Sequence, residues 1–248
     1  SIRVDITKLD SLLNVVGELV LNKAVIHQIG KEMMQTQGLV GSVAELFKAS
    51  QDLDRRVTEL QEGLIEIRMV PVGQIFERLT LAVRKLSREL GKEVNLLISG
   101  EETTLDKSMV EAVADPLLHL IRNALDHGIE PKEKRNMTGK PEIGTIHLSA
   151  IQRGNTVAIE VLDDGRGIDP EKVYEMAIQK GIAEKGKTYS QNELLNFLFL
   201  PGFSTATRVT EVSGRGVGLD VVSKNIARLN GMVDIETTPG KGTKFIIT

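Results

Sequence analysis

Residues 119–128 read HLIRNALDHG, and this stretch decides how the rest of the chain is interpreted. On an α-helix, His119, Asn123 and His127 recur four residues apart and share one broad face with Arg122 and Asp126. Such a polar face suits binding better than packing. Taken alone, it also fits a surface stripe with two ordinary histidines. The opposite face can supply the core with Leu117, Leu118, Ile121, Ala124 and Leu125.

Composition excludes several classes of protein. The 248 residues suffice for one large domain or two modest ones, and a net charge of −3 indicates no nucleic-acid binding by bulk electrostatics. Cysteine is absent, which excludes disulfides and thiolate metal sites and fits a cytoplasmic protein. No apolar run approaches the roughly 18 residues of a membrane span, so we expect no direct membrane insertion. The start at Ser1 and the strand-like end at Thr248 favour a fragment of a longer protein.

Residues 1–67 are predicted to form an antiparallel helical hairpin. Apolar residues alternate three and four apart on both sides of a break around Gly38, as in a coiled-coil seam. Two helices cannot cover their own apolar stripes, so the pattern favours a four-helix bundle of two hairpins, and hence a homodimer. The alternative is packing on the rest of the same chain. The seam comprises Leu9, Leu12, Val16, Leu19 and Ile26, then Leu39, Val43, Leu46, Ser50, Leu53, Val57, Leu60, Leu64 and Ile67.

Residues 68–248 are predicted to mix helices and strands. A helix follows Pro71 and ends at Gly91, and another, at 108–127, is expected to take Gly128 as its C-cap. Late β-hairpins, with helices that can all lie on one face, predict a two-layer α/β sandwich and an α+β chain. Strands are expected at 93–99, 144–151, 156–163, 232–237 and 243–247, with further helices at 170–180, 191–198 and 219–229.

Two glycine-rich segments resemble nucleotide-binding motifs. The run from Gly181 to Thr188 fits GxxxxGK[ST], but we reject a P-loop because a helix precedes it rather than a buried strand. The run from Gly214 to Gly218 is not a Rossmann fingerprint, since its third glycine comes one residue early. It does open directly onto a helix, where backbone N–H groups can bind phosphate. By itself it also fits an ordinary glycine-rich turn.

A third motif, Asp163-Asp164-Gly165-Arg166-Gly167, follows an apolar strand and delivers a carboxylate into a glycine turn. Acidic residues before glycine are common in plain turns. The order of the motifs is more specific: an HxxxN helix, DxGxG after a strand, a GxGxGL loop at a helix start, and Gly242-Thr243 in the final hairpin.

This ordered set resembles the Bergerat ATP-binding fold shared by histidine kinases, Hsp90, DNA gyrase and MutL. The resemblance implies that ATP and Mg²⁺ bind here. It implies that Asp163 accepts a hydrogen bond from the adenine amino group, that Asn123 holds magnesium on the triphosphate, and that Thr243 lies near adenine. Magnesium keeps most of its ligands as phosphate and water, so one amide oxygen suffices. The other expected nucleotide-binding residues are Asp126, His127, Gly165, Gly167 and Ile168, and, in the phosphate-covering lid, Gly214, Arg215, Gly216, Val217, Gly218 and Leu219.

Within that superfamily the chain is most similar to chemotaxis histidine kinases, through HLIRNALDHGIE, IRMVP at 67–71 and FLPGFST at 199–205. The hydrolysing members carry Glu four residues before the asparagine as a base for water, whereas this chain has His119. The resemblance therefore implies protein-histidine kinase activity, with His119, Arg122 and Asn123 acting on the transferred phosphoryl group. The alternative is an ATP-hydrolysing dimeric clamp of the gyrase, Hsp90 and MutL kind.

The phosphorylated histidine of ordinary sensor kinases has no equivalent in this chain. His27 is the hairpin's only histidine and lacks the acidic residue and proline that follow such acceptors, so we expect it on the bundle surface. The resemblance implies an acceptor His on a separate domain. It further implies response regulators, a receptor-coupling protein and chemoreceptors as partners of the full-length protein, and recruitment to membrane receptor arrays.

Overall fold

The computed structural model describes residues 6–37, 41–203 and 218–248. It divides into two compact units, Ser1–Met69 and Val70–Thr248, each with its own internal packing. Along the parts of the chain that are described, no helix is long and apolar enough to cross a membrane.

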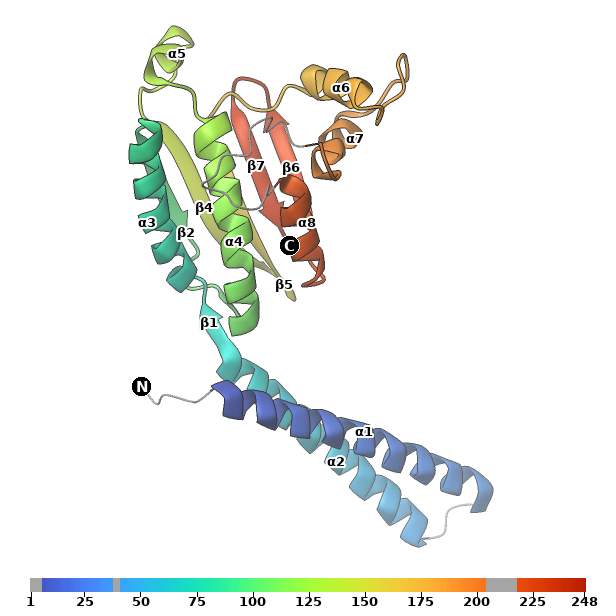
Figure 1. The fold of residues 1–248 in the computed structure, drawn as a ribbon. Helices are drawn as coiled ribbons and strands as arrows, with labels where there is room; N and C mark the ends of the chain where they lie inside the picture. Colours follow the sequence, from blue (N-terminus) through green and yellow to red (C-terminus); the bar gives the residue numbers. More distant parts are fainter. Residues whose placement is uncertain (1–5, 38–40, 204–217) are drawn as a thin grey trace. The chain divides into compact units, whose positions relative to one another are not determined.

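The first unit is the predicted hairpin, made of α1 (Ile6–Gln37) and α2 (Gly41–Arg68), which run antiparallel (Figure 1). One half of each heptad seam is buried between the two arms. Leu9 and Val16 in α1 lie seven residues apart, as do Val57 and Leu64 in α2, and all four side chains are buried. This seven-residue spacing brings the same side of each helix back to the seam.

The other half of the seam is exposed. Leu12, Leu19 and Ile26 in α1 are at least 39% exposed, and so are Leu46, Leu53, Leu60 and Ile67 in α2. The hairpin therefore leaves an unpartnered apolar stripe along both arms. His27 is half-buried rather than simply on the surface, because its ring packs against Phe47 of α2 with centroids 5.3 Å apart.

The second unit is built on a five-stranded sheet with the order β2-β4-β5-β7-β6. β2 and β4 are parallel, and the remaining neighbours are antiparallel. Side chains alternate along these strands, so Ile146, Leu148, Ile159, Val161 and Phe245 fall on one face and enter the main core. The strands are β2 (Val94–Ser99), β4 (Gly144–Arg153), β5 (Thr156–Asp163), β6 (Val233–Thr238) and β7 (Gly242–Ile247), close to their predicted positions.

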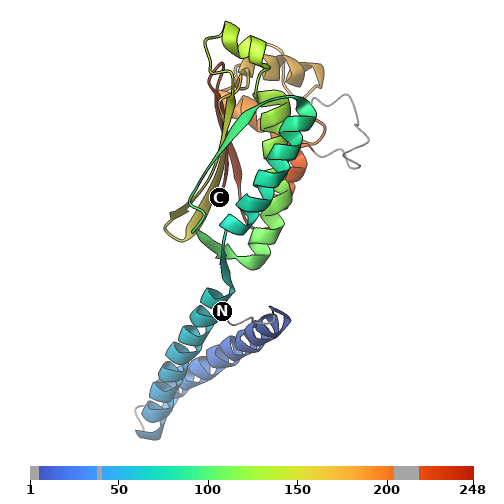
Figure 2. The same cartoon turned by 90° about the vertical axis from the view of Figure 1, so that its left-hand side faces the viewer.

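Three helices cover that face of the sheet, which gives the predicted two-layer arrangement (Figures 1 and 2). They are α3 (Gly73–Leu90), α4 (Lys107–Asn123) and α8 (Leu219–Ala227). Gly91 ends α3 as predicted, with φ of +62°. The smaller elements are β1 (Met69–Pro71) paired with β3 (Thr104–Asp106), α5 (Lys132–Met137), α6 (Pro170–Gln179), α7 (Gln191–Asn196) and the 3₁₀ turn η2 (Phe197–Phe199).

The end of α4 differs from the prediction. Gly128 is not a C-cap, because the chain continues from α4 into one π-helical turn, η1 (Ala124–Gly128), and leaves it at Ile129 in extended conformation. The N–H of Ile129 donates to the Ala124 carbonyl at 2.7 Å, the five-residue bond of a π-turn. Such bulges occur frequently at functional sites.

Candidate nucleotide-binding site

The polar face predicted around Asn123 is one continuous surface of α4 and η1. His119, Arg122 and Asn123 lie in the last turns of α4 and are partly buried, while Asp126 and His127 in η1 are exposed. His127 Nε2 lies 3.6 Å from the Asp126 carboxylate. From His119 to Gly128 this surface extends roughly 13 Å at the rise of a helix.

His119 is held as a neutral imidazole by its surroundings. Burial lowers its pKa below the usual 6.5, and the positive charges of Arg122 and His127 lower it further, against an opposing effect of Asp220. Asp220 lies in the first turn of α8, and α8 packs against α4, the helix that bears His119. At neutral pH, His119 can therefore donate or accept a hydrogen bond, and Arg122 supplies a permanent positive charge beside it.

Asp163 is the last residue of β5 and is only 2% exposed. It lies two residues after Val161, so the alternation of the strand turns its carboxylate towards the covering helices. Its Oδ1 accepts from the Gly165 N–H at 2.9 Å. Burial raises the pKa of Asp163 to about 6, although hydrogen bonds from the Gly165 and Thr243 backbones oppose that shift. The result is a buried acceptor that ionises just below neutral pH.

Two glycines allow the end of η1 to reach this carboxylate. A Cβ on Gly128 would lie 3.0 Å from Asp163 Oδ1, and a Cβ on Gly165 would lie 2.2 Å from the Gly128 carbonyl oxygen. The N–H of Arg166 donates to that same oxygen at 3.0 Å. The HxxxN helix and the DxGxG turn thus pack directly on each other. Only the hydrogen atoms of the two glycines fit between their backbones.

The final hairpin completes the wall beside Asp163. Thr243 of β7 is paired with Asp163 in the register of β5 and β7 and is buried. Its hydroxyl lies 3.2 Å from that of Thr237, which also accepts the N–H of Ile168 at 2.9 Å. Gly167 has φ of +70° and packs on the turn after β6. The structure therefore places Gly165 and Thr243 at the Asp163 carboxylate, and it attaches Gly167 and Ile168 to the end of β6 beside Thr243.

The start of α8 lies at the other end of the polar face. Gly218 is its N-cap and is buried, and Leu219 opens the helix. The first N–H groups of an α-helix have no partners within the helix and favour anions. Gly214, Arg215, Gly216 and Val217 lie outside the described residues. The rejected P-loop run is the turn between α6 and α7, and no strand leads into it.

The donors at the site fit a magnesium ion carried mainly by phosphate. Within residues 6–37, 41–203 and 218–248, no three His, Cys, Asp or Glu side chains gather closely enough to hold a metal. Asn123 offers a single amide oxygen on the polar face, the contribution expected when phosphate and water supply the other ligands. Asp163, a buried acceptor, suits a ligand with an N–H donor.

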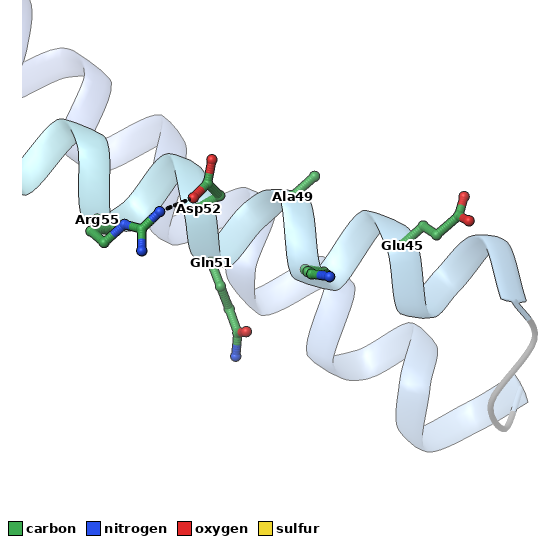
Figure 3. Close-up of a pocket in the computed structure, with 6 residues that line it drawn as sticks. Glu45, Ala49, Gln51, Asp52 and Arg55 are labelled. Carbon is green, nitrogen blue, oxygen red and sulfur yellow. Dashed lines mark hydrogen bonds and ion pairs between the residues drawn. The ribbon is translucent and has the colours of Figure 1, made fainter.

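A depression on the hairpin does not compete with this site. It is lined by Glu45, Lys48, Ala49, Gln51, Asp52 and Arg55, all from α2 (Figure 3). Arg55 and Asp52 pair with each other at 2.5 Å. Because all its lining residues belong to one exposed helix, no polar groups from separate elements converge there.

Two basic residues of the site, Lys92 and Arg135, were missed in the sequence because they lie in charge-rich stretches typical of solvated surface, and Asp164 was noted only as part of its motif. Lys92 donates to the carbonyls of Leu125, Asp126 and Ile129 at 2.7–2.8 Å and so caps the end of η1. Arg135, whose side chain is buried, forms an ion pair with the partly exposed Asp164. The sequence feature that could have pointed to Lys92 is its position directly after the Gly91 C-cap, and this feature is weak.

Comparison with known proteins agrees with this geometry. Residues 112–248 match the family described as "Histidine kinase-, DNA gyrase B-, and HSP90-like ATPase", and residues 1–67 match "Signal transducing histidine kinase, homodimeric domain". A solved histidine kinase domain from Erythrobacter litoralis aligns with 97% of this chain and 91% of its own, but at 16% identity and a TM-score of 0.41 it carries no argument.

Curated relatives are more similar in sequence. The sensor histidine kinase CheAY of Helicobacter pylori is 46% identical over 98% of the chain, and chemotaxis protein CheA of Treponema pallidum is 52% identical over 85%. The CheA of Klebsiella aerogenes is 44% identical over the whole chain. The chain spans 30%, 26% and 37% of these three proteins, respectively. The predicted resemblance is confirmed, and the chain belongs to the family of histidine kinase-, DNA gyrase B- and HSP90-like ATPases.

Proposed function

We propose that this chain is the dimerisation and ATP-binding core of a chemotaxis histidine kinase, with residues 1–67 as the dimerisation domain and residues 68–248 as the kinase domain. One observation carries the proposal. The end of η1 lies against the buried carboxylate of Asp163, and α8, which carries Asp220 in its first turn, packs on α4. An acceptor for adenine and an anion site are thus joined by a surface bearing Asn123.

The nucleotide would lie along that surface. Asp163 accepts the adenine amino group, with Gly165, Gly167, Ile168 and Thr243 forming the walls of the base pocket. Asp126 and His127 lie beside the sugar and the first phosphates. Asn123 holds Mg²⁺, which neutralises charge on the triphosphate. Gly218 and Leu219 present helix N–H groups to phosphate, and Gly214, Arg215, Gly216 and Val217 belong to the same lid by motif.

His119 favours transfer to a protein over hydrolysis. The hydrolysing members carry a carboxylate at this position, whereas here burial and Arg122 lower the pKa of the His119 imidazole and make it a weaker general base than an ordinary histidine. It can instead orient the γ-phosphate through a hydrogen bond, while Arg122 and the metal offset negative charge. The ATP-hydrolysing clamp is not favoured, because the curated relatives carry chemotaxis names.

The exposed heptad stripe supports a homodimer. Leu12 and Leu19 on α1, and Leu53 and Leu60 on α2, are apolar side chains that a second hairpin would cover as a four-helix bundle. The printed description of the matching family, a homodimeric domain, agrees with this.

The remaining partners come from the relatives. The phosphoryl acceptor would be a His on a separate domain, and the full-length protein would be a cytoplasmic kinase serving response regulators. A receptor-coupling protein and chemoreceptors would recruit it to membrane arrays. His27 is not proposed as the acceptor, because its ring packs against Phe47.

A transfer assay tests the proposal. The chain is incubated with γ-labelled ATP and Mg²⁺, alone and with a separate acceptor domain from a similar chemotaxis kinase, while released phosphate is also measured. We expect label on the acceptor and little release, with both transfer and ATP use reduced at least tenfold in His119→Ala. Strong self-labelling at His27 would refute transfer to a separate domain. Substantial release unaffected by His119→Ala would favour the clamp.

A further inference from the structure

Arg135 is the largest fully buried side chain of the molecule's described parts, yet it lies in a helix of only six residues. Its guanidinium forms a two-pronged contact with Asp164, with Nη2 to Oδ2 at 2.8 Å and Nη1 to Oδ1 at 3.1 Å. Its Nε donates to the Pro141 carbonyl at 2.6 Å. The fork therefore fixes α5 and the segment after it against the residue that follows Asp163.

A second cation reinforces the same turn. Lys140 Nζ donates to the backbone carbonyls of Asp164 at 2.9 Å and Gly165 at 2.7 Å. Lys140 also contacts Glu130 at 2.9 Å, and Glu130 reaches Arg135 at 3.2 Å. The cluster therefore joins two cations and two carboxylates beside the Asp163 turn.

The turn after Asp163 is held on two sides. Arg135 and Lys140 contact it on one side, and the end of η1 contacts it at Gly165 on the other. Asp164 Oδ1 accepts the Thr145 N–H at 2.9 Å, which attaches the turn to β4. On the other side, Gly165 packs against the Gly128 carbonyl. The backbone between Asp163 and Gly165 therefore has polar partners or steric contacts on each side. Because this backbone is fixed, the direction in which the Asp163 carboxylate points is fixed as well.

We propose that Arg135, acting through Asp164 and together with Lys140, is a positioning residue that aims Asp163 at the 6-amino group of a purine nucleotide. The inference rests on the proposed function, since it takes Asp163 as the adenine acceptor. Ion pairs withdrawn from water add little stability compared with apolar packing, and in some proteins their role is to define geometry. An Arg fork meets a carboxylate in one planar arrangement, which a Lys ammonium does not reproduce.

The test compares two ligands on four forms of the whole chain. The ligands are ATP and purine riboside triphosphate, which lacks only the 6-amino group, and both are titrated with Mg²⁺. The variants are Asp164→Asn, which keeps an acceptor for Thr145, and Arg135→Lys. The matched control is Lys132→Met, which removes the exposed Lys132–Glu142 ion pair at 2.6 Å from the same short helix. Circular dichroism and thermal melting check the fold of each variant.

We expect wild type and Lys132→Met to prefer ATP by about tenfold or more, the value of a hydrogen bond to a charged acceptor. In Asp164→Asn and Arg135→Lys the preference should fall to about threefold or less, while the affinity for purine riboside triphosphate stays within about twofold. A general loss of structure would weaken both ligands alike and leave the ratio unchanged.

The outcomes separate the two proposals. If wild type binds both ligands equally, Asp163 does not read the amino group and the proposed adenine site fails. If wild type prefers ATP and both folded variants keep the full preference, the positioning role of Arg135 is overturned alone. Should Arg135→Lys fail to fold, Asp164→Asn, which keeps size and shape, decides the result.

Discussion

The Gly128 carbonyl oxygen and the Cα of Gly165 approach so closely that a Cβ on Gly165 would lie 2.2 Å from that oxygen. The two residues are far apart in the sequence and belong to the two motifs that define the site. Their contact packs the end of η1 against the turn that follows β5, and Asp163 lies at this junction. Side chains at either position would separate the Asp163 carboxylate from the surface bearing Asn123.

Gly165→Ala should therefore damage both the fold and the site. The new methyl group meets backbone atoms of Gly128, which cannot move aside as a side chain can. We expect the free energy of unfolding to fall by about 2–3 kcal/mol and nucleotide affinity to fall by at least tenfold. Denaturant unfolding and calorimetric titration of ATP measure the two effects.

The control for that substitution is Gly154→Ala. Gly154 has φ of +60° in the turn between β4 and β5, and a Cβ added there would meet no atom within 4 Å. Gly154→Ala should lower the free energy of unfolding by about 1 kcal/mol, through backbone strain alone, and leave nucleotide binding unchanged. Equal losses of affinity in the two variants would contradict a specific role for the Gly128–Gly165 contact.

Asp163→Asn should stabilise the fold while abolishing tight ATP binding. The native pKa of Asp163 is raised from 3.8 to about 6, so the folded state binds more protons than the unfolded state between those values. Stability therefore falls as pH rises from about 4 to 6, and ionisation of Asp163 costs about 3 kcal/mol at pH 7. Asn removes that cost, but it should weaken adenine binding by roughly 2–3 kcal/mol. An unfolding free energy at pH 7 that drops in the variant would contradict the account.

Nucleotide affinity should depend on pH through the same group. Above pH 6, Asp163 is an ionised acceptor, and below it the carboxyl gains a proton and loses the charge that strengthens its bond to an amino group. We expect the affinity for ATP to fall as pH drops from 7 to 5. Because ATP itself titrates in this range, Asp163→Asn measured in parallel supplies the ligand's own contribution. Parallel profiles for the two proteins would show that Asp163 is not responsible.

The hairpin makes a separate prediction. Leu60 is exposed on the unpartnered stripe of α2, whereas its neighbour Gln61 is exposed outside the heptad seam. Leu60→Lys should convert a dimer to monomers, because each dimer would bury two unpaired charges at a cost of several kcal/mol. Gln61→Lys adds the same charge and should leave the dimer intact. Light scattering at a fixed concentration distinguishes them, and a Leu60→Lys dimer would mean that the stripe packs elsewhere.

Much of this architecture follows from local sequence pattern. The heptad positions of the hairpin predict two helices. The structure adds that one half of the seam, including Val57 and Leu64, is already buried within the chain. Alternation along β5 places Asp163 on the same face as Val161. The order of the motifs predicts which residues gather, and the structure places His119 near α8 and Thr243 beside Asp163.

What the sequence could not supply depends on contacts between distant segments. Gly128 reads as a helix cap, and only the approach of Gly165 reveals why a side chain is excluded there. The Lys132–Met137 helix has no counterpart among the predicted elements, because its run of charged residues reads as solvated surface. Arg135 is buried only because Asp164 and three carbonyl groups converge on it, and no periodicity in the sequence records that convergence.

The most direct test of the central claim is an experimental structure of the chain with Mg²⁺ and a non-hydrolysable ATP analogue. The account predicts that the adenine amino group lies within hydrogen-bond distance of the Asp163 carboxylate. It also predicts that the metal is ligated by Asn123 and that the phosphates extend towards His119 and the start of α8. A nucleotide bound with its base away from Asp163, or a metal held without Asn123, would contradict it.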